Sequence, residues 1–264
     1  MTITTVRTAF VSDMHLGSPN CHAEALAEFL AGLRAERLYL VGDVVDLWWI
    51  SARRASFDRH QSAVIERLRD LARRGTEIIY IPGNHDRSLR ELCGLVLPKM
   101  IVRRDAVHRA RDGRRYLVTH GDDFDGDVQH GGWQERLGDH LYDYVLASNR
   151  LTNRVRRSLG MRYWSLADFI KRQSDLAERY IDRYINAAIG AARARRLDGV
   201  ICGHIHRPAL IERDGIVYAN DGDWVESLTA LTESQEGVLS LIRWHGRAEV
   251  IAELPVPSPL LAAA

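Results

Sequence analysis

The sequence predicts an α/β fold, in which a mostly parallel sheet has helices packed on its faces. Two observations predict this class. Strand-like apolar runs alternate with amphipathic helical stretches, and five of the apolar runs lead directly into short segments rich in glycine, carboxylate or imidazole. At 264 residues the chain is long enough for one large domain with an elaboration. We expect a single domain over residues 1–264, with a helical insert at about 130–196.

The first half of the chain alternates strand-like and helix-like segments. Strands are predicted at Thr5–Val11, Leu38–Val41 and Glu77–Ile81, and helices at Ala23–Ala35 and Gln61–Ala72. Each helical segment carries apolar residues at helical spacing, and a glycine follows the second one. This order favours parallel strands that are joined by crossover helices.

The second half contains a hairpin, a long helical stretch and a return to short strands. Val107–Ala110 and Arg114–Thr119 flank Asp112-Gly113, a dipeptide typical of tight hairpin turns. Helical spacing of apolar residues continues through the insert after a capping-box sequence at Ser165–Asp168. The later strands are predicted at Gly199–Cys202, Ile216–Ala219, Ser227–Leu231, Val238–Arg243 and Glu249–Leu254.

Composition narrows the class of protein. The net charge of +1 argues against a chain that binds nucleic acid through its overall charge. The three cysteines are scattered, which argues for a reducing compartment and against a disulfide framework. No secretory signal and no apolar run long enough to span a bilayer are recognised. We expect a cytoplasmic protein that can associate peripherally with the inner face of the cell membrane.

Polar residues at the strand ends carry the chemistry. The candidate metal ligands are Asp13, His15, Asp43, Asn84, His120, His204 and His206. The first two and the last two are each two positions apart, and on an extended segment such pairs point to the same side. Carboxylate, imidazole and amide donors without thiolate suit Mn²⁺, Fe or Zn²⁺ rather than Ca²⁺. This set is too large for one ion and suits two ions that share Asp43.

Two such ions, ~3.5–4 Å apart, can hold a hydroxide between them and clamp the oxygens of a phosphate during in-line attack. The expected reaction is therefore hydrolysis of a phosphoester or a phosphoanhydride. Nearby residues have simpler interpretations. Asp46 is interpreted first as a helix-start or turn carboxylate, Trp48 and Trp49 as core or groove wall, and Asn220–Trp224 as a tight turn.

The motifs occur together and in a fixed order. They are Asp13-Met14-His15, Gly42-Asp43-Val44-Val45-Asp46, Gly83-Asn84-His85-Asp86, His120 and Gly203-His204-Ile205-His206. As a set they resemble the motifs of the calcineurin-like metallophosphoesterases. The resemblance implies an αββα sandwich, here with the helical insert as a lid.

The resemblance also implies a role for each residue. One metal would be held by Asp13, His15, Asp43 and His206, and the other by Asp43, Asn84, His120 and His204. His85 would be a catalytic residue that contacts the scissile phosphate or the leaving oxygen, and Asp86 would orient or polarise it. Two divalent ions are expected as cofactors, with Mn²⁺ favoured over Fe or Zn²⁺.

Within this superfamily the chain is more similar to the UDP-2,3-diacylglucosamine hydrolases of lipid A synthesis. The similarity rests on size and on the insert that follows His120-Gly121-Asp122. It implies cleavage of the pyrophosphate of a nucleotide-diphosphate glycolipid, from UDP-2,3-diacylglucosamine to UMP and 2,3-diacylglucosamine 1-phosphate. Those enzymes typically carry arginine where this chain has His85, which leaves a related branch with another substrate as an alternative.

Substrate choice is expected to lie in the insert. Between Arg150 and Arg172, basic residues are interleaved with apolar ones, and Asp168 is the single acid. Such a lid suits a nucleotide-lipid substrate and an anionic membrane surface, although a solvated helical face has a similar composition. The expected substrate-binding residues are Asn84, Arg87, Asp127, Arg156, Arg157 and Trp164.

Two other functions stay open at this point. A phosphodiesterase that acts on soluble cyclic or dinucleotide substrates would share every motif, but it would not need a basic and apolar lid. A catalytically inactive scaffold of the same fold usually loses metal ligands, and every expected ligand is present in this sequence.

Overall fold

The computed structural model describes residues 4–53, 57–125, 175–254 and 256. These residues belong to two compact units, Met1–Asp122 with Ala188–Ala264, and Asp123–Ala187. Several sequence predictions lie outside the described residues: most of the insert, its capping box, Asp127, Arg156, Arg157 and Trp164. One domain with a helical lid therefore stays a prediction.

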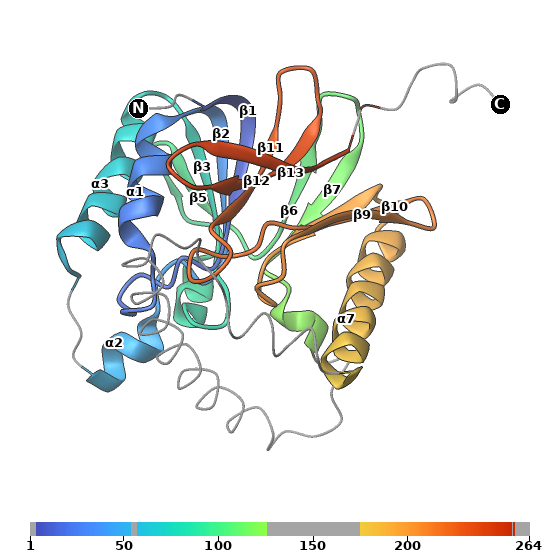
Figure 1. Ribbon diagram of the computed structural model, residues 1–264, viewed down its shortest axis with the longest axis horizontal. Helices are drawn as coiled ribbons and strands as arrows, with labels where there is room; N and C mark the ends of the chain where they lie inside the picture. Colours follow the sequence, from blue (N-terminus) through green and yellow to red (C-terminus); the bar gives the residue numbers. More distant parts are fainter. Residues whose placement is uncertain (1–3, 54–56, 126–174, 255, 257–264) are drawn as a thin grey trace, which may run out of the picture. The chain divides into compact units, whose positions relative to one another are not determined.

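The first unit contains two β-sheets, drawn in Figure 1. The larger sheet has eight strands in the order β13-β12-β11-β1-β2-β3-β5-β4. Their bounds are β1 Thr4–Val11, β2 Leu33–Val41, β3 Glu77–Ile81, β4 Val96–Leu97, β5 Met100–Val102, β11 Thr229–Glu233, β12 Leu239–Trp244 and β13 Ala248–Leu254. The strands β1, β2, β3 and β5 pair in parallel, which confirms the order predicted for the first half of the chain.

The smaller sheet has five strands in the order β6-β7-β8-β10-β9. Their bounds are β6 Ala106–Arg109, β7 Arg115–Val118, β8 Gly199–Cys202, β9 Ala209–Arg213 and β10 Ile216–Asn220. The strands β6 and β7 pair antiparallel around the turn at Gly113, whose φ is 91°, so the predicted hairpin is confirmed. The strands β7, β8 and β10 pair in parallel.

The described helices are α1 Ala23–Gly32, α2 Leu47–Arg53, α3 Arg59–Arg73 and α7 Asp175–Ala194, with short 3₁₀ helices η1 Arg87–Leu92 and η2 Asp122–Phe124. Asp58 caps α3 by accepting hydrogen bonds from the backbone N–H groups of His60 and Gln61. The helix α1 was expected to reach Ala35 but ends at Gly32, because Leu33 begins β2 and pairs with Thr4 of β1. None of the described helices combines the length and apolar character that a membrane crossing requires.

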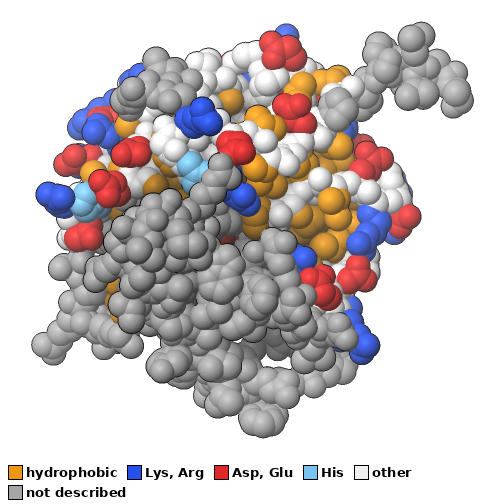
Figure 2. Space-filling model, viewed as in Figure 1, with side chains coloured by type: hydrophobic (Ala, Val, Ile, Leu, Met, Phe, Trp, Pro, Cys, Tyr) orange, Lys and Arg blue, Asp and Glu red, His pale blue; other side chains and the backbone are white. Residues whose placement is uncertain are grey.

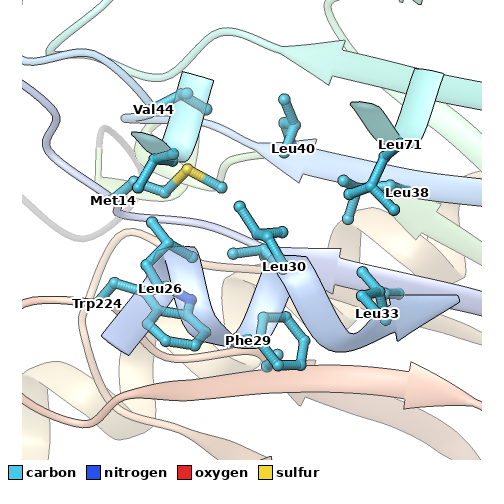
Figure 3. Packing of buried hydrophobic residues seen from close by; sticks show 14 of the residues in the cluster. Met14, Leu26, Phe29, Leu30, Leu33, Leu38, Leu40, Val44, Leu71 and Trp224 are labelled. Atoms are coloured by element: carbon cyan, nitrogen blue, oxygen red, sulfur yellow. The ribbon is translucent and has the colours of Figure 1, made fainter. Parts of the chain in front are cut away.

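Alternate residues of the central strands fill two cores. Leu38 and Leu40 of β2 belong to the core under α1 and α3, whereas Tyr39 and Val41 belong to a second core with residues of the smaller sheet. Figure 3 shows Leu26, Leu30 and Phe29 of α1 packed over the first face. The two sheets therefore share one apolar layer, and helices cover the outer face of the larger sheet, as the α/β prediction requires.

A buried polar cluster lies between the sheets. The carboxylate of Glu233, at the end of β11, accepts hydrogen bonds from Arg7 Nη1 at 2.7 Å and Thr8 Oγ1 at 2.9 Å. It also accepts from the backbone N–H of Arg111 at 2.6 Å and lies 3.1 Å from His108 Nε2. Burial alone would raise the pKa of Glu233, but His108 and the backbone N–H of Arg111 lower it to about 2. This carboxylate joins strands of both sheets.

Candidate metal centre

Residues that follow five strands meet at one edge of the two sheets. They are Asp13 and His15 after β1, Asp43 after β2, Asn84 after β3, His120 after β7, and His204 and His206 after β8. Parallel strands deliver the residues beyond their carboxyl ends to a common edge, which is where α/β folds place ligands. The structure brings all seven predicted ligands together at this edge.

The first group of ligand atoms comes from Asp13, His15 and His206. His206 Nε2 lies 3.1 Å from Asp13 Oδ1, and His15 Nε2 lies 3.8 Å from the same oxygen. The other oxygen of Asp13 accepts a hydrogen bond from the backbone N–H of His204 at 2.9 Å. One Asp13 oxygen is thus fixed by the chain, while the other faces two imidazole nitrogens.

The second group comes from Asp43, His120 and His204. His120 Nε2 lies 3.4 Å from Asp43 Oδ2 and 3.0 Å from Asn84 Oδ1. Asp43 Oδ2 is also 3.9 Å from His15 Nε2, which belongs to the first group. A single carboxylate oxygen therefore faces both groups, which is the position that a bridging ligand needs.

His120 and His15 each contact a neighbouring group through Nδ1 and turn Nε2 toward the site. His120 Nδ1 lies 2.9 Å from the carbonyl oxygen of Val41, so it donates its proton there and Nε2 faces the site. His15 Nδ1 lies 3.2 Å from Asp46 Oδ2, and its buried Nε2 has no hydrogen-bond partner. His15 Nε2 faces the carboxylates of Asp13 and Asp43. Imidazole and carboxylate groups are both common metal ligands, so this arrangement fits a divalent cation.

The backbone is strained at most of the predicted ligands. Among the described residues, nine other than glycine have positive φ, and five of them are Asp13, His15, Asp43, His204 and His206, with φ between 48° and 70°. Such conformations cost free energy in residues other than glycine and concentrate at functional sites. Glycines make close approach feasible: a Cβ at Gly83 would meet the carboxylate of Asp43, and one at Gly203 would meet Ser12 and Asp13.

Ser12 and Asp221 support Asp13 from behind. The Ser12 hydroxyl lies 2.6 Å from Asp13 Oδ2, 2.7 Å from Asp221 Oδ1 and 3.0 Å from the carbonyl oxygen of Gly222. A hydroxyl has one proton, so it can donate to only one of these acceptors at a time. Burial raises the pKa of Asp221 well above its ordinary value. The turn at Asn220–Trp224 predicted from sequence thus lies directly behind a candidate ligand.

His85 lies at the entrance of the site, between an acid and an aromatic ring. Its Nδ1 is 3.3 Å from Asp46 Oδ1, and its ring centroid is 4.2 Å from that of Trp48, which is half exposed. Asp46 also accepts a hydrogen bond from the backbone N–H of Trp49 at 2.8 Å, so its predicted position at a helix start is confirmed. Asp46 therefore caps the start of α2 and contacts both His15 and His85. His85 also forms a third ligand-like group with His15 and Asp43.

Asp86 does not pair with His85 in the way the sequence predicted. Its buried carboxylate accepts hydrogen bonds from Tyr80 Oη at 2.5 Å, from the backbone N–H of Gly83 at 2.5 Å and from that of Val44 at 2.9 Å. These three bonds tie the loop after β3 to the loop after β2 and engage both oxygens of the carboxylate. The acid beside His85 is Asp46, and Asp86 positions the two loops that carry Asp43 and Asn84.

Opposite charges balance each other across the buried site. Burial alone would lower the pKa of His120, but the Asp43 carboxylate raises it to about 10. Burial alone would raise the pKa of Asp43, but His120 and His15 hold it below its ordinary value. The same opposition holds the pKa of Asp46 low, where His15 and His85 outweigh the effect of burial. Protons on these imidazoles would compete with any cation for the site.

Sequence reasoning missed some residues that support the site. Ser12, Tyr80 and Arg90 were not identified; Arg90 Nη2 lies 2.7 Å from Asp122 Oδ1. Asp46 was identified as a helix-start carboxylate, but its contacts with His15 and His85 were not predicted. Arg87, which was predicted to bind substrate, is exposed at the start of η1.

We compared the chain with known protein families, proteins and structures. A model of the family "Calcineurin-like phosphoesterase" matches residues 6–208. The UDP-2,3-diacylglucosamine hydrolase of Marinobacter nauticus is 27% identical over 248 residues, covering 89% of this chain and 96% of that protein. The UDP-2,3-diacylglucosamine hydrolase of Haemophilus influenzae strain PittGG is 25% identical over 244 residues, covering 86% of this chain and 94% of that protein.

Among solved structures, Yfce, a phosphoesterase from E. coli, aligns over 95% of this chain and 99% of its own, with 19% identity and a TM-score of 0.48. The family match spans every residue of both ligand groups, from Asp13 to His206. On that match, this chain belongs to the calcineurin-like phosphoesterase family.

Proposed function

We propose that this chain is a hydrolase with two divalent metal ions that cleaves the pyrophosphate of a nucleotide-diphosphate glycolipid. The substrate would be UDP-2,3-diacylglucosamine, and the products UMP and 2,3-diacylglucosamine 1-phosphate. Membership of the family implies divalent metal ions. The observation that carries the proposal is the position of Asp43 Oδ2 between the two ligand groups.

The donor set assigns the residues that would hold each ion. Asp13, His15, Asp43 and His206 would hold one, and Asp43, Asn84, His120 and His204 the other. Mn²⁺ suits these oxygen and nitrogen donors, with Fe or Zn²⁺ as alternatives. When bound, such ions supply Lewis acidity that polarises phosphoryl oxygens and lowers the pKa of water.

The chain's own residues would then orient the substrate and manage protons. Asp46 Oδ1 lies 3.3 Å from Nδ1 of His85, so Asp46 would orient the ring. Nε2 of His85 would then contact the scissile phosphate or the leaving oxygen. The ring of Trp48 packs against His85 and restricts its rotation. Asn84 and Arg87 would contact the diphosphate from the rim.

The substrate class rests on the relatives, whose printed name is UDP-2,3-diacylglucosamine hydrolase and which align over most of this chain. The insert at about 130–196 would serve as the lid, with Asp127, Arg156, Arg157 and Trp164 as its contacts to the substrate. A lipid substrate places the protein at an anionic membrane surface, on the cytoplasmic side.

The test is a direct assay with product identification. Purified protein with Mn²⁺ is offered detergent-dispersed UDP-2,3-diacylglucosamine, and the products are identified by mass. We expect UMP and the lipid monophosphate, and we expect no reaction after chelation of the metal. Absence of both products, together with turnover of other phosphoesters, would reject the substrate but keep the reaction class.

The rival function is hydrolysis of soluble cyclic or dinucleotide phosphodiesters. The observation that favours it is His85 itself, since the resemblance predicts arginine at this position in the lipid enzymes. Cyclic AMP and bis-p-nitrophenyl phosphate, assayed beside the lipid at matched Mn²⁺, separate the two functions. A kcat/KM for the lipid that exceeds the values for both soluble diesters supports the glycolipid.

A further inference from the structure

Four exposed apolar side chains gather in six residues of the larger sheet's edge. Leu92 ends η1 and is 47% exposed, Leu95 is 41% exposed, and Val96 and Leu97, which form β4, are 69% and 40% exposed. β4 is the last strand of the eight-stranded sheet. A concentration of large apolar side chains on a surface marks an interaction site, whereas single exposed ones are ordinary.

The exposure of these residues is not the result of a loosely packed segment. Leu89, Cys93 and Met100 of the same stretch pack against the main hydrophobic core. The backbone is also tied down, because Gly94 N–H donates to Val102 O at 2.9 Å and Val102 N–H donates to Leu95 O at 3.0 Å. These contacts hold the segment on the fold, while the side chains of Leu92, Leu95, Val96 and Leu97 stay exposed.

The segment that carries these side chains is rich in positive charge. Arg87, Lys99, Arg103 and Arg104 are exposed, and Glu91 is the only acid from residue 87 to residue 104. Lys99 lies at the turn between β4 and β5, directly after Leu97 and Pro98. Exposed apolar side chains with cations at their border match an anionic lipid surface, where the apolar groups enter the interface and the cations meet lipid phosphates.

The same segment is fastened to the metal centre. The helix η1 begins two residues after His85. Arg90, in the middle of η1, forms an ion pair with Asp122 and places its Nη2 3.3 Å from the carbonyl oxygen of Pro82. Asp122 follows the candidate ligand His120 by two residues. A surface held by η1 is therefore connected to both sides of the site where a phosphate would bind.

A second exposed apolar group provides the contrast. Figure 2 shows hydrophobic side chains gathered over β9 and β13, with both acidic and basic side chains at their border. They include Ile211 and Val250, of which Val250 is 54% exposed. The exposed charged neighbours in these two strands are Glu212, Glu249 and Glu253. Acidic residues repel anionic lipid, so this group lacks the charge that the first one has.

We propose that residues 92–99 form the surface by which this protein docks on an anionic lipid bilayer. This inference rests on the proposed function and deepens it. A glycolipid keeps its acyl chains in the bilayer, so an enzyme that cleaves its diphosphate gains from a docking surface joined to the metal centre.

The test measures binding and activity separately. Wild-type protein is sedimented with vesicles of 3:1 phosphatidylcholine and phosphatidylglycerol, and with vesicles of phosphatidylcholine alone, without substrate. The variant Val96→Glu is compared with Val250→Glu, which makes the same change at an exposed valine of the acidic group. We expect Val96→Glu to lower the partition coefficient for the anionic vesicles about tenfold, and Val250→Glu to leave it within twofold of wild type.

A second variant guards against loss of folding. Lys99→Glu reverses an exposed charge at a turn, and we expect it to weaken binding to anionic vesicles about tenfold at low salt, with little effect at high salt. Both variants should hydrolyse bis-p-nitrophenyl phosphate at the wild-type rate. Circular dichroism and thermal midpoints check that each variant is folded.

Several outcomes overturn the proposal. Wild-type protein that does not bind anionic vesicles overturns the proposal. Unchanged binding by both Val96→Glu and Lys99→Glu also overturns it and would assign docking to another surface, such as the insert. A change of oligomeric mass in Val96→Glu, measured by light scattering, would assign β4 to a contact between two copies. Loss of soluble-diester turnover in both variants would make the segment part of the catalytic scaffold.

Failure of the proposed function has a different signature. If wild-type protein binds anionic vesicles through Val96 but does not cleave UDP-2,3-diacylglucosamine in detergent, the docking surface stands and the substrate is rejected. If it cleaves the lipid in detergent and Val96→Glu cleaves it equally well in vesicles, the substrate stands and the docking surface is rejected.

Discussion

Two buried clusters of ionisable groups flank β1, and they differ in backbone strain rather than in pairing. At Glu233 both carboxylate oxygens accept hydrogen bonds, while His108 Nδ1 has no partner. At the candidate metal centre, buried Asp13 and Asp43 face His15 Nε2, which also has no partner. The strand β1 is extended, whereas Asp13 and His15, which follow it, have positive φ. A buried charge or an unpaired imidazole nitrogen is therefore no sign of function by itself, whereas acidic and imidazole groups gathered on a strained backbone are.

The strongest test of the difference between the two clusters is a change at Asp43, where we expect the largest loss of turnover. Asp43→Ala removes the oxygen that faces both ligand groups, so we expect metal stoichiometry below two and turnover lower by roughly 10³-fold or more. Stability of the metal-free protein should also fall, because the change leaves buried His120 without its carboxylate partner and the backbone N–H of His85 without its acceptor. Metal analysis, initial rates and urea unfolding measure the three quantities. Two retained metals with full activity would refute the bridging position.

The next effect is expected at His85, which contacts the site without belonging to either main ligand group. His85→Ala should retain metal but lower turnover by about 10² to 10⁴-fold, the range for loss of a proton-transfer group. Asp46→Asn should act in the same direction by about 10 to 100-fold, because it orients His85 and His15. Equal metal content in both variants is the control, and unchanged turnover in His85→Ala would remove this residue from the reaction.

Glu233 should show the opposite behaviour, with lost stability and retained activity. Glu233→Gln keeps the shape but removes the charge that Arg7 and His108 meet, so we expect a loss of about 3 kcal/mol at pH 7. The folded-state pKa of Glu233 is about 2, below its ordinary value. The charge therefore stabilises the fold above pH ~4.5, and this contribution is lost as the pH falls toward 2. The difference between wild type and Glu233→Gln in urea unfolding should shrink over that range, and turnover at pH 7 should agree within twofold.

The smallest effect is expected at Ser12, which joins the metal centre to Asp221. Ser12→Ala leaves Asp13 in place but removes its hydroxyl partner, so we expect about tenfold weaker binding of Mn²⁺ at one of two sites. Titration calorimetry with Mn²⁺ resolves the two sites. Ser18→Ala is a matched control, because Ser18 is also buried and accepts a hydrogen bond from the backbone of Asn20, outside the ligand groups. Equal Mn²⁺ affinity in the two variants would place Ser12 outside the support of Asp13.

The sequence predicted those helices and strands in which the spacing of apolar residues matches the side chains that the folded protein buries. The strands β1, β2 and β3 have apolar residues on both faces, and β2 places Leu38 and Tyr39 in different cores. The boundary of α1 was missed because Leu33 continues the helical spacing, while pairing with β1 decides in favour of a strand. The antiparallel pair β9 and β10 had an unused signal, the Asp214-Gly215 dipeptide, whose φ values are 51° and 72°.

The candidate site was predictable only where its residues follow strands. Asp13, Asp43 and His120 could be placed at one edge from the direction of their strands alone. The partners of these residues depend on how the loops approach one another, and contacts between loops have no recognisable pattern in the sequence. Asp86 is the clearest case, since its neighbour in sequence is His85 but its bonds go to Tyr80, Gly83 and Val44.

The order in which strands enter the smaller sheet has a consequence during synthesis on the ribosome. The strand β8 lies between β7 and β10 and leads into His204 and His206, which are the last candidate ligands to emerge. A nascent chain that has released β1, β2, β3 and β7 holds the other five ligands but lacks a complete cage for either ion. Catalytic competence would therefore have to wait until residue 206 has been synthesised and β8 has joined the smaller sheet.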